Sequence, residues 1–423
     1  AIDAANLHKS VADMATGGQD LKFPVQIVCP HCDESQELPK KRSQPLMNCK
    51  FCKKEFQQPV PNEPPLPEPV MGALDSPRFE KGRNFANKVW NAARYVLTSI
   101  QADLRAPNTP LKPELLRDED HWILSRLNST VKEATEALEA FEFARGINAL
   151  YGFFWDEFCS WYIELTKPRM APGASVEEKQ ASQAVLLYVL DRSLRLLHPY
   201  CPFISEELWA ELGKRASESQ RNLGRGEYGP GLKRPESRFL ANSAWPQAEA
   251  ELIKPEIEEQ FARTFESVVA IRAVRQELID HSPREKKKDV SVLVSKPLKV
   301  SIKTADDALA ARLQKQSHIL VRMADIETPQ IGRELVPVKP ASATGIKGGT
   351  IYVALQPELV EVERLRLNKV ISKSEQYISR MEGKLKNENF VKNAPPELVA
   401  EERAKLKSEQ DKLGSLKAAL AEL

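Results

Sequence analysis

Residues 83 to 94 read RNFANKVWNAAR, and the fold class can be worked out from this stretch. Its apolar residues, continued to Ile100, recur every three or four positions, which predicts an amphipathic helix with one buried face. Ser76 is a suitable N-cap for it, and Pro77 suits the first helical position. Helices of the same period are expected at about 119–140, 143–167, 177–198, 202–216 and 255–281. Because such a set of helices forms a bundle, the chain is predicted to be mainly α-helical.

Length and composition set the limits for the rest of the chain. A chain of 423 residues suggests roughly two to four folding units. Hydrophobic residues make up 42% and charged residues 28%, which is typical of a chain that buries a core. Lys plus Arg total 61 against 59 acidic residues, so nucleic-acid binding would have to come from local patches. No apolar stretch reaches the roughly 18 residues of a membrane span, so no membrane association is predicted.

The composition changes on both sides of the bundle. Six prolines between Pro59 and Pro69 disfavour a helix and predict a semi-rigid linker. After the bundle, short apolar runs indicate a small α+β unit, with strands at 290–294, 298–302, 319–323 and 351–355 and a helix at 305–316. The expected units are a lead segment at 1–26, a cysteine module at 27–57, a linker at 58–75, the helical bundle at 76–285, the α+β unit at 286–357 and a C-terminal arm at 358–423.

The C-terminal arm shows a longer apolar period than the bundle. Along two segments of the arm, apolar residues follow one another at alternating distances of four and three residues. Pro395-Pro396 separates the two segments. This pattern predicts two helices that fold back on each other as an antiparallel coiled coil.

Four cysteines give the strongest chemical signal. Cys29, Cys32, Cys49 and Cys52 form two C-x-x-C pairs with sixteen residues between them. Four thiolates bind Zn²⁺ tetrahedrally, and the absence of a secretory signal argues against disulfides, so the pattern predicts an N-terminal zinc ribbon. A catalytic zinc would need an open ligand position, so the ion is expected to be structural. His31 could replace a cysteine ligand, but its place inside a knuckle favours a surface role.

The opening helix of the bundle also carries a polar ridge. Guanidinium and ammonium groups can meet phosphates, while amides and an indole can meet unstacked bases, so the ridge could bind RNA. The alternative is a solvated helix face with Trp90 packed inward, and the periodicity alone favours that alternative. The RNA-binding candidates on this helix are Arg83, Asn84, Asn87, Lys88, Trp90, Asn91 and Arg94.

Other motifs point to structure rather than catalysis. The aromatic run at 151–162 has helical spacing and is expected to pack in the core. Asp156 and Glu157 point about 100° apart on a helix, so they are assigned no acid/base role. His198 precedes a proline and is expected at a helix end. No phosphate-binding glycine loop, nucleophile elbow or zinc-protease motif occurs, so no catalytic residue is predicted.

The helix at 83–94 resembles the opening helix of the anticodon-binding domain of class I aminoacyl-tRNA synthetases for valine, isoleucine and leucine. The likeness continues through HWILSRL at 121–127, FWDEFCSWYIELTKP at 154–168 and LHPYCPFISEELW at 197–209. Near the end of the chain, GKLKNENFV at 383–391 resembles the coiled-coil arm of the valyl-tRNA synthetase family.

The resemblance extends over residues 76 to 423, and it implies that the bundle reads a tRNA anticodon stem-loop and that the arm clamps the tRNA. With this resemblance, RNA binding becomes the favoured interpretation of the polar ridge. It also implies phosphate contacts along the arm, although exposed coiled-coil charges often only interact with solvent. The candidate cations of the arm are Lys369, Lys373, Arg380, Lys384 and Lys386.

Complete members of this family are cytoplasmic enzymes that activate valine with ATP and transfer it to tRNA, using H-x-G-H and K-M-S-K-S signatures. Neither signature occurs here, so the chain alone is predicted to be inactive, with ATP bound only by the complete enzyme. TGGQDLKF at 16–23 resembles the segment that follows the catalytic core, so residues 1–26 are interpreted as its remnant. The chain begins without Met and is expected to be a piece of a longer protein whose catalytic and editing domains lie upstream.

Three hypotheses follow from the sequence. The first is the tRNA-binding C-terminal part of a valine-tRNA ligase, with a zinc ribbon that the family does not usually carry at this place. The second is a free-standing, noncatalytic tRNA-binding paralogue. The third is an assembly module built on the zinc ribbon and the coiled coil.

Overall fold

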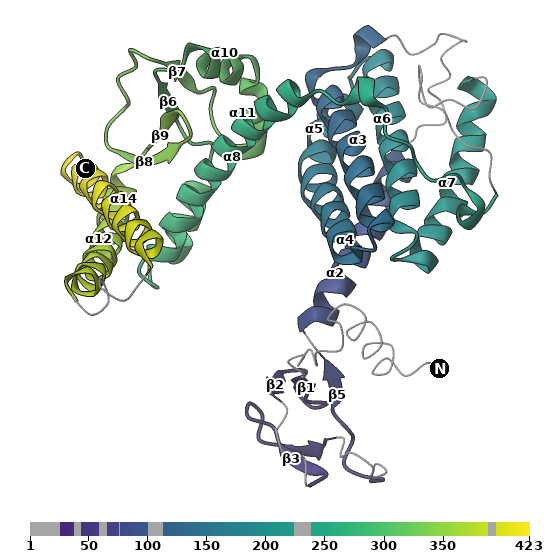
Figure 1. Ribbon diagram of the computed structural model, residues 1–423, viewed down its shortest axis with the longest axis horizontal. Helices are drawn as coiled ribbons and strands as arrows, with labels where there is room; N and C mark the ends of the chain where they lie inside the picture. The colour runs from purple at the N-terminus through teal and green to yellow at the C-terminus, as the bar shows by residue number, and fades with distance from the viewer. Residues whose placement is uncertain are drawn as a thin grey trace. The chain divides into compact units, whose positions relative to one another are not determined.

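The computed structural model describes residues 26–37, 44–58, 66–75, 77–99, 113–223, 238–387 and 395–423. The chain divides into two compact units, Ala1–Lys254 and Pro255–Leu423, which are described separately (Figure 1). The lead segment, apart from Gln26, and the N-cap Ser76 lie outside the described residues.

The cysteine module is built from short antiparallel strands. Strands β2 (Ser35–Glu37), β1 (Gln26–Val28) and β5 (Ala73–Asp75) form one sheet in that order, and β3 (Leu46–Asn48) pairs with β4 (Glu55–Gln57). Its apolar core is small: Ile27 and Phe56 are buried together with two of the cysteines.

Residues 66–75 belong to the cysteine module, whereas the sequence indicated a linker at 58–75. Strand β5 pairs with β1. The side-chain amide of Gln57 donates a hydrogen bond to the backbone carbonyl of Leu66 at 2.8 Å and another to the backbone carbonyl of Pro69. A Cβ added at Gly72 would lie 2.6 Å from the Phe56 ring. Prolines exclude a helix here but do not prevent a loop from packing back on the module, because the Gln57 side chain satisfies its backbone.

The first unit contains the predicted helical bundle (Figure 1). Helix α6 lies at its centre, since residues on all its sides are buried and it packs against α2, α3, α4, α5 and α7. Its N-cap Ser175 and Glu178 form a capping box, which fixes where the helix begins. The helices are α2 (Pro77–Ser99), α3 (Asp118–Glu139), α4 (Phe143–Tyr151), η2 (Gly152–Tyr162), α5 (Ile163–Met170), α6 (Val176–Leu197) and α7 (Pro202–Leu223), with single turns η1 (Pro113–Leu115), η3 (Leu240–Asn242) and η4 (Ala250–Leu252).

The aromatic run is a π-helix within the α4–η2–α5 segment. A π-helix has a wider turn than an α-helix. In agreement with this, the Ser160 hydroxyl donates to the Trp155 carbonyl, five residues earlier, at 2.9 Å. Phe154, Phe158 and Tyr162 are at most 1% exposed, which confirms their predicted core role.

The second unit packs helices against a four-stranded sheet of order β7-β6-β9-β8. Strand β6 is parallel to β7, and the other pairs are antiparallel. Helix α8 contacts β8, β9 and α11, although the sequence analysis had placed it in the bundle. The elements are α8 (Pro255–His281), α9 (Lys287–Val294), β6 (Val300–Thr304), α10 (Asp307–Lys315), α11 (Ser317–Ala324), β7 (Gln330–Gly332), β8 (Ala341–Ile346) and β9 (Gly349–Ala354).

Two of the predicted strands are wrong. Residues 290–294 lie in α9, and residues 319–323 lie in α11. A short apolar run does not distinguish a strand from a buried helical segment. Val290 and Val294 are buried one helical turn apart, and so are Ile319 and Met323, which is the pattern of a helix with one buried face.

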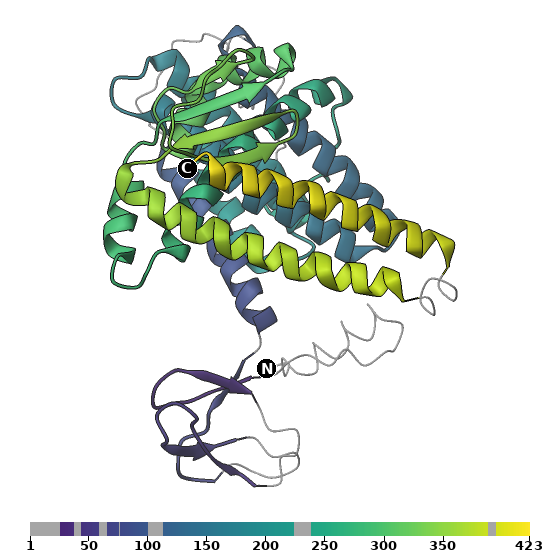
Figure 2. The ribbon, with the colours of Figure 1, turned by 90° about the vertical axis from the view of Figure 1, so that its left-hand side faces the viewer.

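Two long helices end the chain, α12 (Pro357–Lys386) and α14 (Pro396–Ala421) (Figure 2). The Ser374 hydroxyl donates to Glu409 at 2.6 Å, and Lys384 pairs with Glu402 at 3.0 Å. Because the partner number falls as the α12 number rises, the helices are antiparallel, as predicted.

Candidate metal centre and nucleic-acid interface

The four predicted cysteines come together in the first unit. Their sulfur atoms all lie within 4.8 Å of one another, and the Cys29–Cys52 and Cys32–Cys49 sulfur pairs are 3.7 Å apart. A tetrahedron with Zn–S bonds of about 2.3 Å has sulfur atoms about 3.8 Å apart. The cluster therefore has the dimensions to hold one metal ion.

Backbone amides support the thiolates. The amides of Phe51 and Cys52 lie 3.4 and 3.5 Å from the Cys49 sulfur. Burial, the largest influence, would raise the pKa of the Cys49 thiol, but these amides and the neighbouring thiols lower it to about 6. His31 is exposed, and its Nε2 lies 3.2 Å from the Glu55 carbonyl oxygen, which agrees with the surface role expected for it.

The polar ridge of α2 is exposed, while Phe85 and Val89 on the opposite face are 6% and 2% exposed. Trp90 is 44% exposed, so the alternative in which Trp90 packs inward is wrong. Lys88 is half-buried, and the other predicted residues, Arg83, Asn84, Asn87, Trp90, Asn91 and Arg94, are exposed.

Beside the ridge, η2 and the end of α4 contribute rings for which the helical spacing predicted a place in the core. The Tyr151 and Trp155 rings stack at 5.5 Å with an interplanar angle of 8°. The Lys81 ammonium lies 5.2 Å from the Tyr151 ring, and that of Lys88 lies 5.1 Å from the Trp155 ring. Lys81 and Lys88 are seven residues apart and the two rings are four residues apart, so each pair lies on one side of its own helix, but nothing in the sequence pattern showed that these two sides meet. This cation–ring cluster extends the polar ridge.

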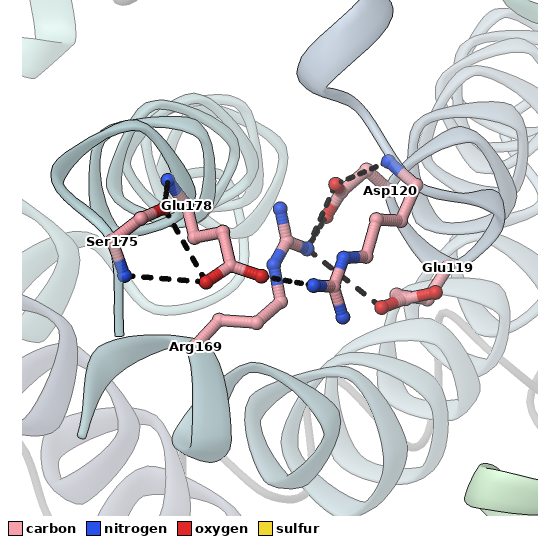
Figure 3. A network of polar contacts seen from close by, with 6 residues as sticks. Glu119, Asp120, Arg169, Ser175 and Glu178 are labelled. Carbon is pink, nitrogen blue, oxygen red and sulfur yellow. Dashed lines mark hydrogen bonds and ion pairs between the residues drawn. The ribbon is translucent and has the colours of Figure 1, made fainter. Parts of the chain in front are cut away.

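Buried charge fixes the helices of the bundle (Figure 3). The Arg169 Nη1 donates to both carboxylate oxygens of Asp120 at 2.8 Å, and Arg169 and Asp120 are 2% and 0% exposed. The Tyr162 hydroxyl donates to Asp120 at 2.7 Å, and the Arg117 amide donates at 2.9 Å. Burial raises the pKa of Tyr162, so its hydroxyl remains a donor.

A second ion pair extends this network toward α6. The Arg117 guanidinium pairs with Glu178, and Glu178 accepts hydrogen bonds from the amide and hydroxyl of Ser175 (Figure 3). The ion pairs Arg169–Asp120 and Arg117–Glu178 thus hold the start of α3, the end of α5 and the start of α6 together. Neither was predicted.

The predicted cations of the arm are exposed on α12. Lys369, Lys373, Arg380 and Lys384 are spaced by four, seven and four residues, so they follow one side of the helix. Lys384 pairs with Glu402 across the coiled coil, whereas Lys369 and Lys373 make no ion pair within the described part of the chain. Lys386 is exposed near the end of the helix.

The base of the arm is held by a buried ionic network within the second unit. Arg366 donates to both carboxylate oxygens of Glu363 at 2.7 Å and to Glu277 of α8 at 2.7 Å. The Ser342 hydroxyl of β8 donates to Glu363 at 2.8 Å. These contacts join α12 to the sheet and to α8 and fix the direction in which the arm leaves them.

Two family models match the chain. Residues 120–290 match the anticodon-binding domain of tRNA ligases, and residues 360–423 match the tRNA-binding arm of valyl-tRNA synthetases. The chain is homologous to valyl-tRNA synthetases. It contains the C-terminal anticodon-binding and arm domains of that family. The predicted arm cations lie within the arm domain.

Curated relatives agree with the family models. The valine-tRNA ligase of Thermotoga maritima is 35% identical over 351 residues, which cover 83% of this chain and 35% of the relative. That of Rhodopirellula baltica is 31% identical over 411 residues, covering 96% of this chain and 37% of the relative. That of Staphylococcus carnosus is 33% identical over 347 residues, covering 82% and 36%. The chain thus spans little more than a third of the length of these valyl-tRNA synthetases.

The described helices include none that is both long and apolar enough to cross a lipid bilayer.

Proposed function

We propose that this chain binds valine-accepting tRNA as the C-terminal part of a valine-tRNA ligase, with the bundle engaging the anticodon stem-loop and the arm engaging the tRNA body. The observation that carries the proposal is the pair of family matches, to an anticodon-binding domain of tRNA ligases and to a tRNA-binding arm of valyl-tRNA synthetases, on a single chain. The exposed ridge of α2 and the row of cations on α12 supply the chemistry that RNA requires.

In this proposal the chain itself performs no catalysis. Activation of valine with ATP belongs to the upstream catalytic domain, and removal of wrong amino acids belongs to the upstream editing domain. The complete enzyme is proposed to work in the cytoplasm. The four cysteines are proposed to hold a structural Zn²⁺, because four thiolate ligands leave no open position for a substrate.

The test is the affinity of the purified chain for valine tRNA and for isoleucine tRNA. We expect tighter binding of valine tRNA and no turnover of ATP and valine by the chain alone. Equal affinity for any RNA would favour the assembly module. A reading frame that continues upstream through H-x-G-H and K-M-S-K-S would separate the ligase from a free-standing paralogue.

The arm contact predicts a specific change in salt dependence. Each phosphate that is neutralised contributes about 0.9 to the slope of log affinity against log salt on duplex nucleic acid. Lys373→Gln should therefore reduce the slope by about one. The matched control is Lys296→Gln, which removes an exposed lysine from outside the arm and should leave the slope unchanged. An unchanged slope for Lys373→Gln would remove Lys373 from the interface.

The ridge contact predicts a loss of affinity without a loss of stability. Trp90 is 44% exposed, so Trp90→Ala should leave the melting temperature nearly unchanged. Stacking of a base on an aromatic ring contributes about 1–3 kcal/mol, so tRNA affinity should fall by roughly 5- to 150-fold. Phe239→Ala, which truncates a half-exposed ring outside the ridge, is the control. Unaltered tRNA affinity in Trp90→Ala would show that the exposed Trp90 ring does not contact the RNA.

A further inference from the structure

The cysteine module contains two turns of the same backbone geometry, the first knuckle (Cys29–Glu34) and the second knuckle (Cys49–Lys54). In each, the amide of the first cysteine donates to the carbonyl five residues later, at 3.0 and 2.9 Å. In each, the amide four residues later donates back to that cysteine, at 3.0 and 3.1 Å. Asp33 and Lys53 occupy the same left-handed position, with φ of 56° and 63°. The knuckles are therefore structural copies whose side chains can be compared directly.

The two knuckles carry opposite charge. The first ends in Asp33 and Glu34, and the second ends in Lys53 and Lys54, with Lys50 beside them. All five side chains are exposed, and none of the three lysines forms an ion pair with a described carboxylate. A metal ion at the centre would hold both knuckles through two thiolates each, so its charge does not explain why only one of them is basic.

The second knuckle also exposes a ring. Phe51 is 57% exposed on a turn that is fixed by its own amide, which lies 3.4 Å from the Cys49 sulfur. His31, at the equivalent position of the first knuckle, is directed by its Nε2 to the Glu55 carbonyl. Exposing a phenyl ring on a rigid turn gains nothing within the module, because its apolar surface stays in water. The ring therefore fits a role in contact with a partner.

We propose that the second knuckle is an additional RNA-binding surface, on which the Phe51 ring stacks with an unpaired base while Lys50, Lys53 and Lys54 neutralise the adjacent phosphates. An exposed ring between cations is the chemistry that binds single-stranded RNA, because bases have apolar faces and the backbone is anionic. The acidic first knuckle repels phosphate, so the module binds RNA from one side only. The inference rests on the proposed function in one respect, namely that the RNA is the tRNA.

Two matched double variants of the zinc-loaded chain of 423 residues test this inference. Lys53→Asn/Lys54→Gln and Asp33→Asn/Glu34→Gln change equivalent positions, and asparagine tolerates the left-handed backbone in both. We expect the lysine variant to reduce the salt slope of tRNA binding by about 1.4, which is about 0.7 for each phosphate on a single strand, and the acidic variant to leave the slope unchanged. An unchanged slope in the lysine variant would overturn a contact at the second knuckle. An equal reduction of the slope in both variants would overturn it as well.

A third variant tests the ring. Phe51→Ala should weaken tRNA binding by roughly 5- to 150-fold at every salt concentration without changing the slope, since stacking releases no counterions. Zinc content and melting temperature should match those of the unmodified chain. Normal tRNA affinity in all the knuckle variants would overturn this inference alone, whereas no tRNA binding by the unmodified chain would overturn the proposed function.

Discussion

Replacing Cys49 with serine should release the metal and unfold the cysteine module, while the helical bundle stays folded. Structural zinc contributes about 10–16 kcal/mol of apparent binding free energy in small zinc-dependent folds. The apolar core of the module is too small to compensate, because a fully buried Phe or Ile contributes only about 1.5–3 kcal/mol and the core contains one of each. Metal analysis should find about one zinc per unmodified chain and almost none in the variant.

The control for this experiment is Cys201→Ser, because Cys201 is a free cysteine outside the cluster. It should keep its zinc and its module. Limited proteolysis distinguishes the cysteine module from the helical bundle. In the Cys49→Ser variant only the module should become sensitive to the protease. Full zinc content in Cys49→Ser, or little zinc in the unmodified chain, would contradict a metal site built from these four thiolates.

Replacing Asp120 with asparagine should destabilise the helical bundle by about 3–5 kcal/mol, because it leaves the buried Arg169 charge without its carboxylate. The Glu119 carboxylate, 3.8 Å from the Arg169 Nη1, is too far away to replace the two short hydrogen bonds that Asp120 accepts, and the Arg169 Nε and Nη2 are buried without a hydrogen-bond partner. The same change turns one carboxylate oxygen into an NH2 group, so Asp120 loses either the oxygen that accepts from Tyr162 or the one that accepts from the Arg117 amide. Urea unfolding followed by helical circular dichroism measures the loss.

The control on the same helix is Glu133→Gln, which changes an exposed carboxylate and should alter the free energy of unfolding by less than about 0.5 kcal/mol. Adding Arg169→Met to Asp120→Asn should recover part of the loss, because the unpaired charge is then removed. A loss below about 1 kcal/mol in Asp120→Asn, or no recovery in the double variant, would show that the ion pair does not hold the bundle.

The sequence predicted those features that depend on local spacing. The period of Phe85, Val89 and Ala92 identified α2, and two C-x-x-C pairs identified the cysteine cluster, because each pattern lies within a few turns of chain. The strands expected at 290–294 and 319–323 were wrong, since runs of four or five apolar residues fit a strand and a buried helix equally well.

Features that depend on contacts between distant segments were not predictable in this way. Asp120 and Arg169 lie 49 residues apart, and neither residue shows a pattern that marks it as buried. The return of β5 to β1 and the exposure of Trp90 likewise depend on which segments pack together. The four cysteines were predicted as metal ligands from their spacing, but the shared backbone of the two knuckles, which allows their charges to be compared, became visible only in three dimensions.

The ionic network at the base of α12 has a mechanical consequence. A helix of 30 residues is about 45 Å long, so a small rotation at its foot would become a large displacement at its tip. The contacts of Arg366 with Glu363 and Glu277 hold the first turns of α12 against α8. A force applied at the far end of the helix should therefore be transmitted to the small sheet and not be absorbed by bending at a hinge. The arm would then behave as a stiff lever, whose position depends on the body that carries it.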